Sequence, residues 1–258
     1  MEVRSFGLTD VGRRRQTNED DLLLEPAHRL FAVADGMGGH AAGEIAARLA
    51  IETLHDTLAR VAPGQPYGSI AEVGERLVAA VTEANRRICE SIDCHEERRG
   101  MGTTVVALSY LDDDAVIGHV GNSRLYLLRR SELQRMTSDH SWVNEQVKLG
   151  LMSDDMAQRH PMRNIVTRAL GSRSDVAVDV STVRIEPGDL FLLCSDGLNT
   201  MLTDVEIEHS LKAHRNDPEG ACHALVAAAN DRGGEDNVTV IAVLFGGVAA
   251  KSSPRKNA

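Results

Sequence analysis

The sequence predicts an α+β domain built in layers, with sheets that are largely antiparallel. Apolar, β-rich segments follow one another through tight turns, as the strands of hairpins do. Apolar stripes at helical spacing occur in neighbouring pairs. No internal repeat or change of composition divides the 258 residues, so we expect one domain over residues 1–246. The polar, basic segment 247–258 is predicted to be a disordered tail.

The N-terminal half begins with strands and continues into two helices. Short apolar runs between charged or turn residues predict strands at 3–8, 21–24 and 30–35. Apolar side chains at helical spacing predict a first helix over 45–61, and a Pro- and Gly-rich break over 63–68 ends it. Ser69 and Glu72 have the spacing of a capping box at the start of a second helix over 70–88.

The second half is richer in strands. The predicted strands are 103–110, 115–120, 125–128, 176–185, 190–194 and 238–245. The predicted helices are 141–149, 204–211 and 219–231. Between them, residues 152–168 are polar, with mixed charge and little periodicity. Strands in hairpins with helices in pairs are what the α+β class requires.

Composition excludes several classes of protein. A net charge of -10 and a pI near 5.5 argue against a nucleic-acid or anionic-membrane partner. The four cysteines have no C-x-x-C spacing, which argues against a zinc site and for a reduced, cytoplasmic compartment. No apolar stretch approaches the ~20 residues of a membrane helix, and the first residues contain no apolar signal region. We expect a cytoplasmic monomer without membrane insertion.

Carboxylates recur where apolar strands begin or end. Asp35-Gly36 follows the strand 30–35, Asp196-Gly197 follows the strand 190–194, and Asp236 opens the last strand. One Asp-Gly pair alone favours a turn, since this dipeptide is common in turns. Three strand-edge aspartates together are typical of a metal site with oxygen ligands. Both interpretations stay open from spacing alone.

A divalent-cation site would explain further residues. Mg²⁺ and Mn²⁺ bind carboxylates, backbone carbonyls and water, and two such ions favour phosphate-ester hydrolysis. The candidate ligands are Asp35, Asp196 and Asp236, the carbonyl of Gly36, and Glu19 and Asp20 through water. Arg15 lies four residues before Glu19, and its planar guanidinium suits a phosphate group. The chain has no Walker-type loop, H-E-x-x-H or G-x-S-x-G motif that would indicate another chemistry.

Six motifs occur in the order of a known family. They are Arg15-x-x-Asn18-Glu19-Asp20, Ala34-Asp35-Gly36-Met37-Gly38-Gly39-His40, Gly102-Thr103-Thr104, Gly121-Asn122-Ser123-Arg124, Ser195-Asp196-Gly197-Leu198 and Asp236-Asn237-Val238-Thr239. Together they resemble the metal-dependent serine/threonine protein phosphatases of the protein phosphatase 2C type, in particular the compact bacterial branch. The likeness runs over residues 3–245, and residues 1–246 would then be the catalytic domain.

The resemblance implies a fold, a mechanism and a role for each residue. The fold would be a four-layer α-β-β-α sandwich, with the metals in a cleft at one end. Asp35 would bridge two Mn²⁺ or Mg²⁺ ions, and a hydroxide between the ions would attack a phosphoserine or phosphothreonine in one step. The remaining roles are Gly36, Asp196 and Asp236 as metal ligands, Arg15 as phosphate anchor, and Glu19 and Asp20 as holders of metal-bound water. Residues 140–171 would form a mobile flap.

Two positions depart from the family pattern. Asn122 stands where an aspartate usually binds a third, looser metal, so we expect a weak third site; a turn with positive φ is the alternative explanation of Asn122. Met37 stands where eukaryotic relatives carry a histidine regarded as the general acid. His40 is the replacement candidate for protonating the leaving oxygen, and a helix-start or packing role for His40 is equally consistent with the sequence.

Three functions share this set of residues. The first is a protein phosphatase that acts on phosphoproteins marked by a cognate serine/threonine kinase. The second is a regulatory pseudo-phosphatase that binds phosphopeptides, and the third is a small-molecule phosphohydrolase. The presence of Arg15 and of all three strand-edge aspartates favours activity.

Overall fold

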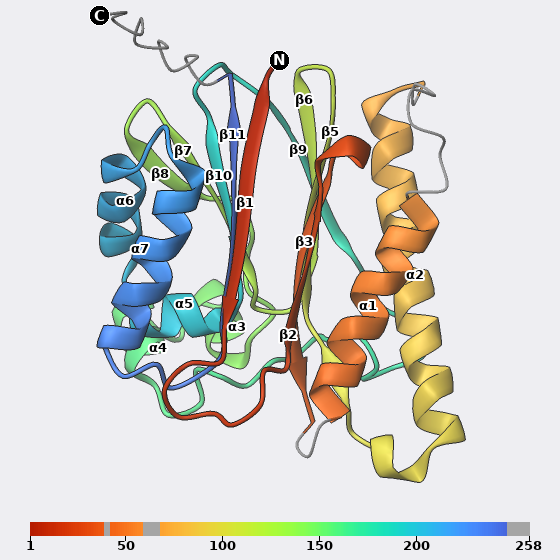
Figure 1. Cartoon of the computed structure of the whole chain (residues 1–258). Coiled ribbons are helices and arrows are strands. Elements are labelled where there is room, and N and C mark those ends of the chain that lie inside the picture. The colour runs from red at the N-terminus through yellow and green to blue at the C-terminus, as the bar shows by residue number, and fades with distance from the viewer. Residues whose placement is uncertain (39–41, 59–67, 247–258) are drawn as a thin grey trace, which may run out of the picture.

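Two antiparallel sheets stack face to face, and a pair of helices covers the outer face of each (Figure 1). The computed structural model describes residues 1–38, 42–58 and 68–246. This arrangement confirms the predicted α+β class and the four-layer sandwich. No helix within the described ranges is long and apolar enough to span a membrane.

The first sheet contains both ends of the described chain. Its strand order is β1 (Val3–Asp10), β11 (Val238–Phe245), β10 (Leu190–Cys194), β7 (Arg124–Arg129) and β8 (Glu132–Arg135). β1 and β11 pair along their whole length, from Val3 opposite Phe245 to Asp10 opposite Val238. The start of β11 therefore lies beside the loop that leaves β1.

The second sheet is formed by the middle of the chain. Its order is β2 (Asp20–Glu25), β3 (Leu30–Met37), β5 (Val105–Leu111), β6 (Asp114–Val120) and β9 (Asp179–Arg184), with β4 (Gly102–Thr103) paired to the end of β3. The 3₁₀ turn η1 (Pro26–His28) joins β2 to β3. In that hairpin Asp20 is the direct partner of Asp35.

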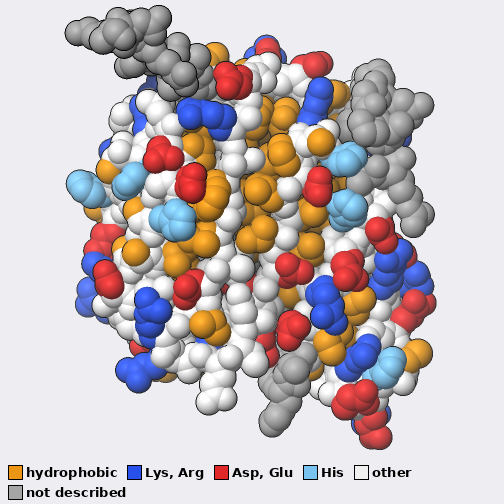
Figure 2. Space-filling view, in the orientation of Figure 1, with side chains coloured by type: hydrophobic (Ala, Val, Ile, Leu, Met, Phe, Trp, Pro, Cys, Tyr) orange, Lys and Arg blue, Asp and Glu red, His pale blue; other side chains and the backbone are white. Residues whose placement is uncertain are grey.

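Amphipathic helices cover the outer faces of the two sheets with their apolar sides. α1 (Ala42–Leu58) and α2 (Ile70–Cys94) pack on the second sheet, and α6 (Asp204–Ala213) and α7 (Pro218–Asp231) pack on the first. Between the sheets lies a third apolar core, where the ring of Phe245 meets those of Tyr110 and Phe191 edge-on. Figure 2 shows hydrophobic side chains along the middle of one face, between charged flanks.

The structure adds short elements that the sequence pattern did not predict. They are β4, β8, the 3₁₀ turn η2 (Glu96–Arg98), α4 (Asp154–Arg159) and α5 (Asp196–Met201). Each has two to six residues, too few for its periodicity to be recognised in the sequence. At Asp196-Gly197 the chain enters α5 instead of the turn that was one of the two open interpretations, since Asp196 is its first residue and a carboxylate favours a helix N-terminus. The predicted α3 is confirmed at Trp142–Lys148.

Two helix boundaries also differ from the prediction. Ser69 caps α2 by accepting from the Glu72 N–H, but the Glu72 carboxylate accepts from the Gly68 N–H instead of completing the capping box. α2 continues to Cys94, beyond the predicted end. The end of the first predicted helix, most of the 63–68 break and the 247–258 tail lie outside the described residues.

Candidate metal centre

Four aspartates from distant parts of the chain meet at one end of the sandwich. Asp20 and Asp35 face each other across the β2–β3 pair. Asp196 is brought in by the β10–α5 junction, and its backbone N–H lies 3.4 Å from the Asp35 Oδ2. Asp236 is delivered by the loop that precedes β11. The three strand-edge aspartates of the sequence analysis therefore converge, and Asp20 lies in the same cluster rather than at its margin.

The carboxylates raise one another's pKa. Burial raises the pKa of Asp35 well above its ordinary value, and the charges of Asp196, Asp20 and Asp236 raise it further. Burial raises the pKa of Asp20 to about 7, although hydrogen bonds from Thr239 and Ser195 oppose the rise. The pKa of Asp196 is raised by burial and then by the charge of Asp236. Without a cation, this cluster opposes its own ionisation.

The donor set fits hard divalent cations. It is made of oxygen atoms, which Mg²⁺ and Mn²⁺ prefer. Asp20 Oδ2 and Asn122 Oδ1 are buried and have no hydrogen-bond partner among the described residues, although buried polar atoms are normally paired. A cation bound to the cluster would compensate both the charge and these unpaired oxygens.

Gly36 is required here by close packing of the backbone. A Cβ at Gly36 would lie 2.2 Å from the Gly43 carbonyl oxygen and 2.5 Å from that of Glu19. Its N–H donates to the same Glu19 carbonyl at 3.1 Å. The absent side chain thus lets the first residues of α1 and the Glu19 backbone close around the end of β3.

Arg15 extends from the β1–β2 loop to the carboxylates. Its Nη2 donates to Asp236 Oδ2 at 2.8 Å, and about half of the side chain is exposed. The loop is attached to the β11 side because Arg13 N–H donates to the Gly234 carbonyl at 2.8 Å. Arg15 therefore presents a partly exposed guanidinium at the edge of the cluster.

Glu19 follows Arg15 by four residues in the chain and is nearly buried. Burial raises the pKa of Glu19; Arg15 lowers it, and Asp236 and Glu44 raise it. Its backbone N–H donates to Asn237 Oδ1 at 2.9 Å. The structure therefore places Glu19 against the same cluster as Asp236.

Asn237 is a positioning residue to which the sequence motif gave no role. Besides accepting from Glu19, its Nδ2 donates to the carbonyls of Val11 and Thr17, each at 2.9 Å. One buried amide thus fixes both ends of the loop that carries Arg15. An asparagine opening a buried strand was the only signal in the sequence.

Asn122 faces the centre from the β6–β7 turn. It is 6% exposed, and its Nδ2 donates to Asp196 Oδ2 at 2.8 Å. The residue with positive φ in this turn is Gly121, at +111°, whereas Asn122 has no positive φ. The explanation of Asn122 as a left-handed turn residue is therefore wrong.

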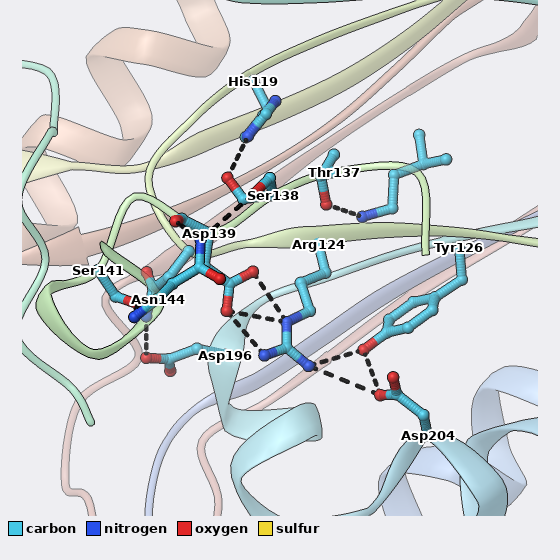
Figure 3. Close-up of polar contacts among 12 residues, drawn as sticks. His119, Arg124, Tyr126, Thr137, Ser138, Asp139, Ser141, Asn144, Asp196 and Asp204 are labelled. Carbon is cyan, nitrogen blue, oxygen red and sulfur yellow. Dashed lines mark hydrogen bonds and ion pairs between the residues drawn. The ribbon is translucent and has the colours of Figure 1, made fainter. Parts of the chain in front are cut away.

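A buried ion-pair network centred on Arg124 lies close to Asn122 and Asp196 (Figure 3). Arg124 donates to both carboxylate oxygens of Asp139, with its Nη2 2.7 Å from Oδ2, and to the Tyr126 hydroxyl at 3.0 Å. That hydroxyl donates to Asp204 at the start of α6. The network connects β7, the residues before α3, and α6, and it was not foreseen from the sequence.

A second cluster, His119, His140 and Asp179, has a different character. The two imidazoles stack at 4.7 Å with planes 12° apart, so their in-plane lone pairs do not converge on one ion. His140 Nδ1 accepts from the Gly121 N–H, which leaves Nε2 to donate to Asp179 at 3.2 Å. We therefore interpret the cluster as a clasp that attaches the 140–171 segment to the β6–β7 turn. His40, the candidate proton donor, lies outside the described residues.

Comparison with known proteins gives concordant matches. Residues 11–227 match the family model described as Protein phosphatase 2C. The serine/threonine phosphatase stp of Listeria innocua is 38% identical over 238 residues, spanning 91% of this chain and 93% of that protein. The Mycobacterium tuberculosis serine/threonine phosphatase PstP/Ppp has a crystal structure with a TM-score of 0.86 and 34% identity, covering 94% of this chain and 98% of that one. A structure of the PstP catalytic domain in complex with two manganese ions gives a TM-score of 0.82 and 33% identity, covering 93% and 97%.

Proposed function

The chain belongs to the protein phosphatase 2C family, and from this we propose how its carboxylate centre serves the reaction. The protein is a metal-dependent serine/threonine protein phosphatase. The observation that carries the proposal is the convergence of Asp20, Asp35, Asp196 and Asp236 with Arg15 at one end of the sandwich. The presence of Arg15 together with these aspartates supports an active phosphatase over a pseudo-phosphatase.

We assign each group a task. Asp35, Asp196 and Asp236, with the Gly36 carbonyl, hold two divalent cations, and Glu19 and Asp20 hold water beside them. When bound, the cations lower the pKa of coordinated water and so supply a nucleophile for single-step hydrolysis at neutral pH. Arg15 binds the non-bridging phosphate oxygens, because a guanidinium offers two parallel donors. His40 remains the candidate proton donor, and a pH–rate profile altered in His40→Gln would support it.

Loss of one ligand tests this proposal. In Asp196→Ala we expect turnover of a phosphothreonine peptide to fall by at least about a hundredfold with Mn²⁺ or Mg²⁺ present, because the remaining oxygens cannot hold the nucleophile in place. Asp93→Ala, an exposed carboxylate on α2, is the matched control and should keep wild-type turnover. Circular dichroism checks that both variants are folded.

The same hydrolysis assay distinguishes the two alternative functions, a pseudo-phosphatase and a small-molecule phosphohydrolase. A wild-type protein that binds the peptide but never hydrolyses it would be a pseudo-phosphatase. Faster hydrolysis of a panel of phosphorylated metabolites than of phosphoserine and phosphothreonine peptides would favour a small-molecule phosphohydrolase. Undiminished peptide turnover after exhaustive chelation would contradict the metal mechanism.

A third, weaker cation site at Asn122 is a finer proposal. Its support is the buried, unpaired Oδ1 of Asn122 next to Asp196. Replacing the amide by a carboxylate adds charge, so Asn122→Asp should bind one further Mn²⁺ more tightly, by about tenfold or more. Equilibrium dialysis measures the stoichiometry independently of turnover. Identical binding curves for wild type and variant would remove the third site.

The partners and the compartment are also proposals. We propose phosphorylated proteins as substrates, which the relatives' names support. A cognate serine/threonine kinase that places the phosphate groups follows as a further proposal. All four cysteines are unpaired, which supports a reducing compartment such as the cytoplasm. We propose a monomer, which size-exclusion chromatography with light scattering would test.

A further inference from the structure

A cavity of about 260 Å³ opens beside the metal centre. Asn122 and Asp196 form the part of its wall that it shares with the centre. The opposite wall is formed by α3, α4 and the residues that follow α4, and α5 with the start of α6 completes it. It is smaller than the roughly 300–1,000 Å³ of most small-molecule sites, so it suits one or two side chains rather than a metabolite.

Three arginines line this cavity, and we call it the arginine cavity after them: Arg135, Arg159 and Arg163. Within the described part of the chain, none of the three donates to a carboxylate or forms another side-chain hydrogen bond. The fourth arginine of the wall, Arg124, is different because Asp139 neutralises it in a buried pair. Three cavity-lining arginines therefore have no side-chain partner among the described residues.

The carboxylates of the wall are mostly engaged elsewhere. Asp139 and Asp204 belong to the Arg124 network, and Asp196 belongs to the metal centre. Asp154 at the start of α4 belongs to neither group, and the described wall contains four arginines and four aspartates in all. The described wall of the cavity thus offers three unengaged guanidinium groups to an incoming group, and guanidinium binds carboxylate or phosphoryl oxygens in a bidentate fashion.

We propose that the arginine cavity binds an anionic group flanking the phosphorylated residue of the substrate, so that acidic sites are dephosphorylated faster. The inference rests on the proposed function, because it places the reacting phosphate at Arg15 and the aspartates. A substrate peptide whose phosphate lies at that centre would run past Asp196 and Asn122. The side chains next to its phosphorylated residue would then enter the cavity. The flanking group is an Asp or Glu carboxylate, or a second phosphoserine.

Matched phosphothreonine peptides test the proposal. Their flanking residues, on the N-terminal or the C-terminal side, are Glu, Ala, Lys or phosphoserine. We expect wild-type kcat/KM to be about three- to tenfold higher for a Glu flank than for an Ala flank on one side, as partly exposed ion pairs give modest gains. The advantage should shrink as salt is raised. A gain confined to the phosphoserine peptide would identify the second phosphate as the natural ligand.

Charge reversal gives the sharper result. In the double variant Arg159→Glu/Arg163→Glu, the preference should invert, so that the Lys flank is cleaved faster than the Glu flank. If these arginines had only a structural role, the double variant would have a lower kcat/KM for every peptide. The ratio of kcat/KM between the Glu-flanked and Lys-flanked peptides would then stay as in wild type. Arg184→Gln is the matched control, since Arg184 is 71% exposed and lies at the other end of the sandwich beside the β5–β6 turn.

The outcomes separate this inference from the proposed function. If wild type hydrolyses the Ala-flanked peptide but shows no preference among the flanking residues, the arginine cavity does not bind the flanking group. The same follows if the double variant keeps the wild-type ratio of kcat/KM between the Glu-flanked and Lys-flanked peptides. If wild type with Mn²⁺ hydrolyses neither the peptides nor para-nitrophenyl phosphate, the proposed function itself fails.

Discussion

At the residue scale, a single amide holds the loop that carries Arg15. Asn237 is 4% exposed, and its side chain makes three hydrogen bonds to the backbone of the 11–19 loop. Asp236 beside it accepts from Arg15, so one dipeptide places both the proposed metal ligand Asp236 and the loop that faces it. The loop has little apolar packing of its own, because most of its residues are exposed.

Asn237→Ala should therefore damage stability and substrate binding together. It leaves two carbonyls and one N–H without partners, which we expect to lower the unfolding free energy by about 2–4 kcal/mol. It also releases Arg15, so KM for para-nitrophenyl phosphate should rise more than kcat falls. Urea denaturation and steady-state kinetics measure the two effects. Asn216→Ala, an exposed asparagine, should stay within about 0.5 kcal/mol of wild type. Wild-type stability in Asn237→Ala would contradict the assigned role.

At the element scale, the short helix α5 connects the two halves of the metal centre. It begins at Asp196 and packs against the first residues of β11. A Cβ at Gly197 would lie 1.9 Å from the Asn237 carbonyl oxygen, so the helix approaches that strand as closely as a backbone allows. Asp196 and Asp236 are neighbours because of this approach.

Gly197→Ala should push α5 away from β11. Since the new methyl meets backbone rather than a movable side chain, we expect a loss of about 1–3 kcal/mol and at least about tenfold in turnover. Gly74→Ala in α2 is the matched control. There the added Cβ meets Val116 at an ordinary 3.6 Å, and alanine favours a helix over glycine, so stability should be unchanged or higher. Equal behaviour of the two variants in urea melts would refute the close-packing explanation.

At the scale of the whole molecule, the carboxylate cluster sets the stability of the metal-free protein. The pKa of Asp20 is raised from 3.8 to about 7, and that of Asp35 is raised too, so the folded state holds protons that the unfolded chain has released. The contribution of these groups to the free energy of unfolding therefore falls as the pH rises from 3.8 to about 7, the unfolded and folded pKa values of Asp20. His119 and His140 act in the opposite direction, because burial lowers their pKa.

The difference between wild type and Asp35→Asn isolates the aspartate contribution, since both contain the same histidines. In EDTA at about pH 8, Asp35→Asn should be more stable by on the order of 2 kcal/mol, and the gain should shrink toward pH 5. Adding Mn²⁺ should stabilise wild type and reverse the order, because only the intact cluster binds the ion tightly. Thermal and urea unfolding with and without EDTA provide the readout. A gain in EDTA that does not change with pH would contradict the repulsion argument.

The fold was largely readable from local pattern. Long helices such as α2 and buried strands such as β3, β10 and β11 repeat their periodicity often enough to be recognised. The elements that the pattern missed, α4, α5, β4 and β8, have two to six residues, and tertiary contacts rather than propensity decide them.

Local sequence patterns were enough to predict the layered α+β class and the residue types of the candidate centre. An apolar strand that ends in a carboxylate and a glycine can be recognised without knowing its neighbours. Tertiary structure alone decided that Asp20 stands opposite Asp35, that Asn237 holds the Arg15 loop, and that three arginines face one cavity. These relations depend on strand register and on contacts between separate segments, such as that of Asn237 with the 11–19 loop, which no local pattern encodes.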